Sequence, residues 1–455
     1  MSTSIQADDN EGVREESLLL LGASSKKTEI REGSSWWASS FIIINAGLGA
    51  GLLNFADSYN DAGGIVIALT LQTIMLVFCV LALIVLAYCS DVACCSTYQE
   101  VVETMCGKRA WLTCSLLIAV YCFGCCITFL IIIADQIDNV MADNFGPDFC
   151  ARWYLSRQCT LSVTSIVIIL PLCFPKKIDF LKYVSAMGVF AVIYVTFLVV
   201  YRYYTGQYVP GPIKTEPNSW QDVFLVIPTI CFSYQCHISV VPVYSCLRKR
   251  TLTEFSKSVC VAMVACVLCY TLTAVYGYLT FGGNVNADIL LSYAPSDTAA
   301  LIAMIAVAAK MYVTYPILCF CGRVAADNLY IDCKQLSPAL ADQGEKTRRI
   351  LMTLVWFFAS LLLAVFIPDI GSVIGVLGSF AAVFIFVYPG MCFMQGMLAR
   401  DAAIEQRRSK VALICTVGFI ALGVFIFGVV LVQVIMKAVA SEHQKGPIIN
   451  GSPCY

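Results

Sequence analysis

Long apolar runs, separated by short polar stretches, repeat along almost the whole chain from residue 36 onward. Each run is near the roughly 20 residues that an α-helix needs to cross a hydrocarbon layer about 30 Å thick. With glycine, proline and charge clusters taken as the ends of runs, the pattern predicts eleven transmembrane helices, of which the fourth and ninth are short for a full crossing. They cover residues 36–60, 63–89, 110–140, 159–174, 180–203, 220–246, 258–281, 298–321, 347–367, 371–398 and 409–437.

Composition agrees with a membrane protein. Hydrophobic residues make up 59% of the chain and charged residues 13%, whereas soluble domains are about 45–50% apolar and about 25% charged. We therefore expect an all-α polytopic membrane domain at 36–440, a disordered cytosolic tail at 1–35 and a short luminal or extracellular tail at 441–455. The N-terminal tail lacks the apolar stretch of a secretory signal peptide. Because 29 basic and 30 acidic residues nearly balance, nothing indicates a nucleic-acid partner.

The distribution of basic residues predicts the orientation of the chain. If the N-terminus is cytosolic, 22 of the 29 lysines and arginines fall in cytosolic segments, six fall outside, and Lys310 lies within a span. Cytosolic loops of membrane proteins carry an excess of lysine and arginine. The N-terminus is therefore predicted inside and the C-terminus outside.

Most of the 24 cysteines lie inside apolar spans, where cysteine acts as a small packing residue rather than as part of a metal cluster. Cys150 and Cys159 are different, because they share the loop between the third and fourth spans on the non-cytosolic side. A disulfide persists on that side of a membrane. We therefore expect these two either to form a disulfide or to remain free thiols.

Two spans, five apart, are interrupted by residues that break helices. The first contains Gly47, Gly49 and Gly51, and in the sixth, Pro228 and Pro242 bracket a polar cluster. That cluster comprises Ser233, Tyr234, Gln235 and His237. Discontinuous helices at equivalent places in two five-span halves are typical of inverted-repeat transporters, whose unwound backbone binds substrate and ions. The alternative is close helix packing through Gly47 and Gly51.

Ten short motifs carry a family resemblance over about residues 36–435. They are NAGLGAGLLNF, TYQEVV, FLIIIADQ, PTICFSYQCH, VPVY, LTFG, LLSY, TYPILCFCGR, FIPDIG and FIFVYPG. The chain resembles the amino acid/auxin permease family, and within it the sodium-coupled neutral amino acid transporters with their lysosomal, glutamine-transporting branch. The resemblance implies eleven spans, the 5+5 inverted repeat of the leucine transporter fold with broken helices 1 and 6, and cation-coupled carriage of small neutral amino acids such as glutamine and asparagine.

The resemblance also implies a site. Its substrate-binding residues would be Gly47, Leu48, Gly49, Ala50, Gly51, Cys231, Phe232, Ser233 and Tyr234, with the carboxylate at the first break and the amine at the second. Asn45 and Thr314 match residues that bind sodium in the family. Sodium prefers such oxygen ligands, although a hydroxyl within a membrane helix also often bonds back to the preceding turn.

Lys310 and Asp57 are ionisable residues in or beside the spans, where a charge usually has a function. Lys310 lies one turn before Thr314 and puts sodium coupling in question. It would replace or tune the coupling cation while paired with a carboxylate, Asp57 or Asp135, or else its stem would extend to an interface. Asp57 departs from the family's apolar FPAAF-like segment, and it either attracts cations in a vestibule or is solvated at the end of its span.

His237 and Asp135 are the other two ionisable candidates. His237 is the only histidine within the spans, and it would either respond to protons or pack beside the second break. Asp135, in the family-like FLIIIADQ, would serve coupling or be an interfacial carboxylate at a helix end.

The N-terminal tail contains an acidic dileucine pattern, built from Glu15, Glu16, Leu19, Leu20 and Leu21. Such a signal is read by an adaptor protein, and it favours a lysosomal membrane over the plasma membrane. We expect a monomeric transporter surrounded by lipid, with sodium or a proton as coupling ion and no other cofactor. An amino-acid-sensing receptor with little flux is the alternative, and an enzyme is not expected because no soluble loop is long enough to build a catalytic site.

Overall fold

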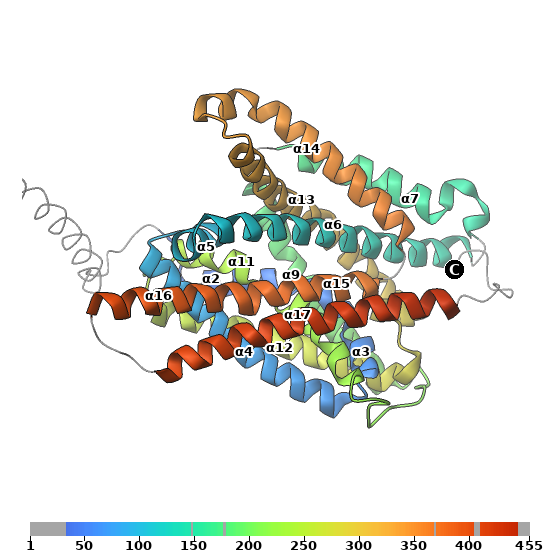
Figure 1. The fold of residues 1–455 in the computed structure, drawn as a ribbon. Coiled ribbons are helices and arrows are strands. Elements are labelled where there is room, and N and C mark those ends of the chain that lie inside the picture. The colour runs from blue at the N-terminus through green and yellow to red at the C-terminus, as the bar shows by residue number, and fades with distance from the viewer. Residues whose placement is uncertain (1–32, 147–148, 176–178, 368–369, 405–409, 445–455) are drawn as a thin grey trace, which may run out of the picture.

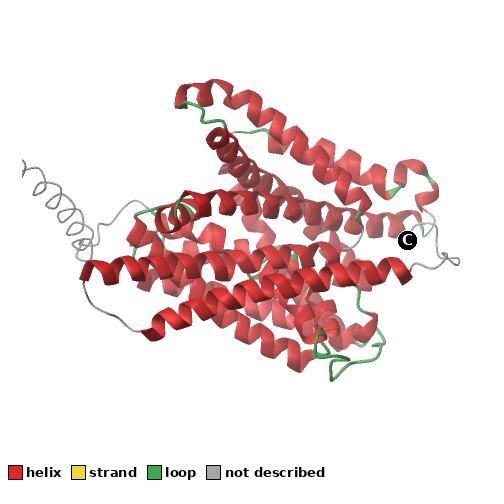
Figure 2. Cartoon of the chain, viewed as in Figure 1, coloured by secondary structure: helices red, strands yellow, loops and turns green. Residues whose placement is uncertain are grey.

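The computed structural model describes residues 33–146, 149–175, 179–367, 370–404 and 410–444. In these residues all regular structure is helical, apart from one β-bridge between Ser34 and Leu247 (Figure 2). The predicted fold class, an all-α polytopic membrane protein, is confirmed.

The first two-thirds of the fold contains α2 (Trp36–Gly47), α3 (Gly51–Asp61), α4 (Ile65–Ala93), α5 (Tyr98–Cys106), α6 (Lys108–Phe145), α7 (Arg157–Thr164), α8 (Leu170–Cys173), α9 (Asp179–Thr205), α10 (Ile227–Ser233), α11 (His237–Ser245) and α12 (Leu252–Phe281). The remainder contains α13 (Thr298–Cys333), α14 (Pro338–Phe366), α15 (Ile370–Ala382), α16 (Tyr388–Ile404) and α17 (Lys410–Gln444).

Nine helical segments in the described residues are long and apolar enough to cross a membrane, and the bent pair α2 and α3 adds a tenth. The segment Arg157–Cys173, which runs from α7 through a π-helical turn into α8, is also apolar but shorter. Each of the eleven predicted spans thus coincides with a helical segment. The count of eleven crossings stays a prediction, because the fourth segment is shorter than the others.

The ninth span is not short, which corrects the sequence-based expectation. α14 begins at Pro338 rather than at residue 347 and continues to Phe366. Proline suits the first turn of a helix, because its missing N–H would have no partner there. The charged stretch that hydropathy assigned to a loop is helical, and Glu345 and Arg349 form an ion pair of 3.0 Å one turn apart on it.

A short helix also forms where a loop was expected. α5 follows the second span, and its N-terminus has a capping box in which Thr97 and Glu100 bind each other's backbone N–H groups. The motif TYQEVV, quoted above only for its resemblance, is therefore a helix start.

The helices pack around α6 and α13, which lie side by side over much of their lengths. In Figure 1, α7 and α14 lie on one side of α6, and α4 and α12 lie on the other. In the most apolar window of α6, 72% of the residues are buried, compared with 17% in α17. α6 is thus a central helix, whereas α17 lies at the periphery of the bundle and faces lipid.

The start of the first interrupted span and the end of the second are joined by backbone hydrogen bonds. Ser34, just before α2, donates its N–H to the carbonyl of Cys246, which follows α11, and accepts from the N–H of Arg248, both at 2.9 Å. The Ser258 hydroxyl of α12 donates to the Trp36 carbonyl at 2.9 Å. On this side of the bundle, α2, α11 and α12 are therefore held together.

Candidate functional site

The first predicted break is present. α2 ends at Gly47, α3 begins at Gly51, and their axes differ by 57°. Ala50 occupies the N-cap position of α3, so no side chain caps the first turn of that helix. Uncapped N–H groups at a helix start attract a carboxylate or another anion.

The second predicted break is also present. α10 ends at Ser233 and α11 begins at His237, leaving three non-helical residues, Tyr234–Cys236. Pro228 lies in the first turn of α10, where proline is tolerated, and Pro242 lies inside α11. The predicted cluster of polar residues therefore coincides with the interruption itself.

The two breaks lie against each other. A methyl group added to Gly51 would meet the Ser233 hydroxyl at 1.9 Å, so only glycine allows this approach of α3 to α10. The Tyr270 hydroxyl of α12 lies within hydrogen-bond distance of two carbonyls, that of Gly47 and, at 3.1 Å, that of Ser233. By contrast, a methyl group on Gly49 would meet only the Gly47 carbonyl, at 4.0 Å. The backbone at Gly49 is therefore open on that face.

Of the residues that the resemblance assigns to substrate, Leu48 and Ala50 lie in the first break, and Cys231 and Phe232 lie in the last turn of α10. The structure thus brings the two predicted groups of residues together. Tyr270 was not predicted from the sequence. The sequence indicates a role for Tyr270 only weakly, because tyrosine is common in apolar spans.

Gln72 is a second residue that the sequence analysis missed. It is fully buried on α4, accepts a hydrogen bond from Tyr59 of α3 at 2.5 Å, and donates to Tyr234 at 3.0 Å and to Thr271 at 3.1 Å. It thus connects both broken spans to α12. A lone amide in the apolar run 63–89 was the available signal, because a polar group in lipid requires partners.

We expect Gln72→Leu to weaken ligand binding at the two breaks about tenfold or more and also to lower Tm. The substitution leaves the buried hydroxyls of Tyr59 and Tyr234 without their partner, and each unpaired group costs about 1–3 kcal/mol. Thr271→Val, which removes one of the three hydrogen bonds, is the matched control with a smaller effect. Ligand binding and thermal unfolding of the purified variants measure both, and an unchanged Tm in Gln72→Leu would contradict the connecting role.

A network of polar side chains joins α3 to α10 and to the loop that follows α12. Asn54 of α3 donates to the carbonyl of Ala287 at 2.9 Å, in the loop between α12 and α13. The hydroxyls of Ser58 and Thr229 lie 3.0 and 2.9 Å from the Asn54 side-chain oxygen, and 2.6 Å from each other. This network joins α3, α10 and the loop, so the breaks are enclosed from this side. None of the four was predicted.

The same loop carries a buried carboxyl group, Asp288, which accepts hydrogen bonds from Gln136 of α6 at 2.7 Å and from the Leu290 N–H at 2.9 Å. Burial raises the pKa of Asp288 to about 7, although both hydrogen bonds act to lower it. An aspartate in an unfolded chain releases its proton near pH 3.8. Between these pH values the folded protein binds more protons than the unfolded one.

Stability should therefore fall as pH rises from about 4 to about 7, and the loss should be complete above the folded-state pKa. We expect Tm to be a few degrees lower at pH 8 than at pH 5, and we expect this dependence to weaken in Asp288→Asn, which mimics the protonated group. Thermal unfolding across this range measures it. If Tm depends on pH equally in wild type and in Asp288→Asn, Asp288 does not titrate in this way.

Lys310 and Thr314 lie on α13 near the first break. The ammonium group of Lys310 donates to the carbonyl of Leu48, and the Thr314 hydroxyl donates back to the Lys310 carbonyl at 2.8 Å. Lys310 is buried, so its stem does not extend to an interface. It passes over Gly188 of α9, where an added methyl group would meet its Cγ at 2.7 Å. Asn45 lies in the last turn of α2, also beside the break.

The carboxylate proposed as a partner of Lys310 has another partner. Asp135 and Asp138 of α6 form ion pairs with Arg157 of α7, at 2.6 and 2.7 Å. The predicted pair of Lys310 with Asp135 is therefore not formed, because Asp135 is paired with Arg157. Asp57 lies half-buried on α3. Whether it attracts cations stays a prediction.

His237 is fully buried in the first turn of α11, beside the second break. Its ring nitrogens lie 3.1 Å from the Gln235 side-chain oxygen and 3.3 Å from the Cys79 carbonyl. These contacts fit the packing interpretation of His237. A response to protons stays a prediction.

Two further sequence-based expectations concern the periphery. Cys159 lies on the first turn of α7, and its disulfide with Cys150 stays a prediction. The side chain of Cys150 lies outside the described residues, as does the dileucine pattern Glu15–Leu21.

Comparison with known proteins gives a consistent result. Residues 32–436 match the family model described as transmembrane amino acid transporter protein. Sodium-coupled neutral amino acid transporter 7 of Danio rerio is 43% identical over 92% of this chain and 91% of its own length. The Homo sapiens protein of the same name is 43% identical over 88% of this chain and 87% of its own, and solute carrier family 38 member 8 of Homo sapiens is 35% identical over 85% and 91%.

Proposed function

Because the chain belongs to the transmembrane amino acid transporter family, we propose that its two breaks bind a small neutral amino acid, such as glutamine or asparagine, and carry it across a membrane. The family and these relatives are transporters, not enzymes. The observation that carries the proposal is the meeting of the breaks, where one tyrosine hydroxyl, that of Tyr270, reaches backbone carbonyls of both. A transport site at mid-membrane requires unwound backbone of this kind.

The substrate's two charged groups fit the two breaks. Its carboxylate would accept hydrogen bonds from the uncapped start of α3, where the helix dipole is positive. Its ammonium would donate to carbonyls at the end of α10, between Cys231 and Tyr234, where the dipole is negative. The open face of Gly49 would let the ligand approach the backbone closely.

Alternating access would move the bundle formed by α2 to α4 and α10 to α12 against the remaining helices, which we propose form a 5+5 inverted repeat. The hydrogen bond from the Lys310 ammonium group of α13 to the Leu48 carbonyl joins the two parts at the first break, so it would have to open as the bundle moves. The pairing of Ser34 with Cys246 lies within the bundle and would move with it.

The coupling ion would act at Lys310. Its ammonium group binds the Leu48 carbonyl, an oxygen of the first break that a coupling sodium ion would otherwise bind. Two of the three relatives named above, the transporters 7 of Danio rerio and Homo sapiens, are called sodium-coupled. We propose that transport here is coupled to sodium or to protons, and that Lys310 is the residue through which the cation acts.

We further propose a lysosomal membrane as the location, with the N-terminus in the cytosol. The acidic dileucine pattern at Glu15–Leu21 and the excess of basic residues in the inside segments support this. An adaptor protein would bind the dileucine pattern.

Uptake of each neutral amino acid by the purified protein in sealed proteoliposomes tests the proposal, with the sodium and proton gradients varied independently. We expect uptake of at least one small neutral amino acid, and empty liposomes are the control. Saturable binding without uptake would favour the sensing receptor. Neither binding nor uptake of any amino acid would refute the proposed site.

A further inference from the structure

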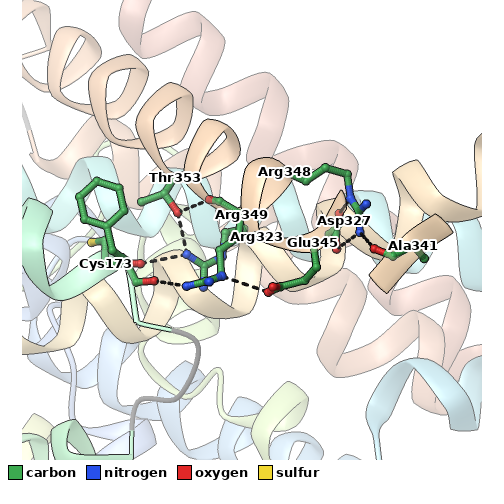
Figure 3. Close-up of polar contacts among 9 residues, drawn as sticks. Cys173, Arg323, Asp327, Ala341, Glu345, Arg348, Arg349 and Thr353 are labelled. Atoms are coloured by element: carbon green, nitrogen blue, oxygen red, sulfur yellow. Dashed lines mark hydrogen bonds and ion pairs between the residues drawn. The ribbon is translucent and has the colours of Figure 1, made fainter. Parts of the chain in front are cut away.

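A cluster of arginines lies between α8, α13 and α14, away from the two breaks (Figure 3). Arg323 of α13 donates through one nitrogen, Nη1, to the carbonyl of Cys173 at 2.9 Å and to the Thr353 hydroxyl at 2.6 Å. Arg349 of α14 donates to the carbonyl of Phe174 at 2.5 Å. Both arginines therefore bind the carbonyl end of the short helix α8, where the helix dipole favours a cation.

The charges in this cluster do not balance. Arg348 pairs with Asp327 at 2.7 Å, and Arg349 pairs with Glu345 at 3.0 Å. Arg323 has no carboxylate partner among the described residues, although its exposed fraction is only 3%. Its Nε and Nη2 atoms make no hydrogen bond within that part of the chain. A buried charge without a counter-ion is costly, and within the described residues the partners of Arg323 are neutral: two hydrogen-bond acceptors and the Phe320 ring, whose centroid lies 5.5 Å from the Arg323 Cζ.

The Arg323 side chain also lines a cavity. Its volume is about 190 Å³, and it is lined by Arg323, Arg349, Asn328, the carboxylates Asp327 and Glu345, and the apolar residues Phe320, Val324 and Met352. Pockets for drug-sized ligands are usually about 300–1,000 Å³, so this cavity accommodates a smaller group. Asp327 and Glu345 are already paired with Arg348 and Arg349, so the Arg323 guanidinium group and the Asn328 amide are the donors left to a ligand.

The surroundings favour a lipid over a free ion. Val324, which lines the cavity, has an exposed fraction of 39% and offers an apolar surface to acyl chains beside it. The cavity lies near the connection between α13 and α14, which the distribution of basic residues predicts to be cytosolic. Basic pockets between membrane helices on that side bind anionic head groups.

We propose that this cavity binds the phosphate group of an anionic membrane lipid, with Arg323 as its main ligand. A guanidinium group donates in a fork that matches phosphate oxygens. The bound head group would supply the missing negative charge and hold the ends of α8, α13 and α14 together. The inference does not depend on the proposed transport activity, and its measurement is binding alone.

Thermal unfolding of the full-length protein in detergent tests it, with dioctanoyl phosphatidic acid as the probe. Dioctanoyl phosphatidylcholine, which has no net charge, and inorganic phosphate at the same concentration are the comparison ligands. We expect phosphatidic acid to raise Tm in a saturable way and the other two to have little effect.

Three variants locate the site. Arg323→Gln removes the unpaired charge, and we expect about tenfold weaker binding or more, because one charge-assisted hydrogen bond is worth about that factor. Val324→Phe fills the cavity and leaves both arginines in place, so it tests the site even if Arg323→Gln does not fold. Lys108→Gln is the control, because it removes one positive charge from an exposed residue that is paired with Asp332, outside this cavity.

Loss of the Tm shift in Val324→Phe, with its retention in Lys108→Gln, would support the proposal. An equal shift with inorganic phosphate would show that the ligand is a free ion and overturn the assignment to lipid. A shift that persists in Val324→Phe and in Arg323→Gln, or no shift in wild type, would overturn the site itself.

Discussion

Gly51→Ala is expected to reduce amino acid uptake about a hundredfold or more. The new methyl group would lie 1.9 Å from the Ser233 hydroxyl oxygen and 3.1 Å from the Ser233 Cα, so side-chain rotation alone cannot relieve the overlap. Forcing the two breaks apart would cost more than the about 2.7 kcal/mol that corresponds to a hundredfold change. Initial uptake rates in proteoliposomes, normalised to folded protein, measure the effect.

Gly49→Ala is the matched control for this prediction. It adds the same group two residues away, where the nearest atom is the Gly47 carbonyl oxygen at 4.0 Å. We expect wild-type Tm but a raised KM, because the methyl group would occupy space needed by the substrate. An unchanged KM would mean that the substrate does not contact this face.

Rescue separates a local clash from general damage. Ser233→Gly removes the hydroxyl oxygen and the Cβ that the new methyl group would meet, and leaves the Cα at 3.1 Å. The double variant Gly51→Ala with Ser233→Gly should therefore recover part of the lost uptake. Wild-type uptake by Gly51→Ala alone would contradict the close approach of the breaks.

Lys310→Met is expected to change the response of uptake to sodium and pH and to lower its rate about tenfold or more. Methionine keeps an unbranched stem but removes the ammonium group, so the Leu48 carbonyl loses its charged donor. Uptake is measured with each gradient varied alone. If Lys310→Met retains the wild-type dependence on both sodium and pH, Lys310 has no role in coupling.

Gly188 provides an independent test of where Lys310 lies. In Gly188→Ala the new methyl group would meet the lysine Cγ at 2.7 Å and its Cδ at 2.9 Å, so we expect uptake to fall about tenfold. Lys310→Ala removes both atoms. In that background Gly188→Ala should have little further effect, and additive losses would contradict the observed path of the lysine stem.

The interruptions themselves were predictable, because their causes are local. Gly47 to Gly51 and the proline-bracketed cluster around Tyr234 break a helix whatever surrounds them, and both breaks lie where the pattern predicted. Local reasoning also misled. The charged start of α14 was assigned to a loop, because hydropathy measures affinity for lipid and not helix formation.

The sequence by itself determined that this is an all-helical membrane protein, where its long apolar helical segments lie and which two of them are interrupted, since hydropathy and backbone restrictions act over one or two helical turns. Only the tertiary structure decided the partners. In the folded chain Gln72 and Tyr270 lie at the breaks, Lys310 donates to the Leu48 carbonyl, and Asp135 forms an ion pair with Arg157. A buried polar group requires a partner, but the sequence does not state which one, because the residues that meet are up to 262 positions apart and depend on how the helices pack.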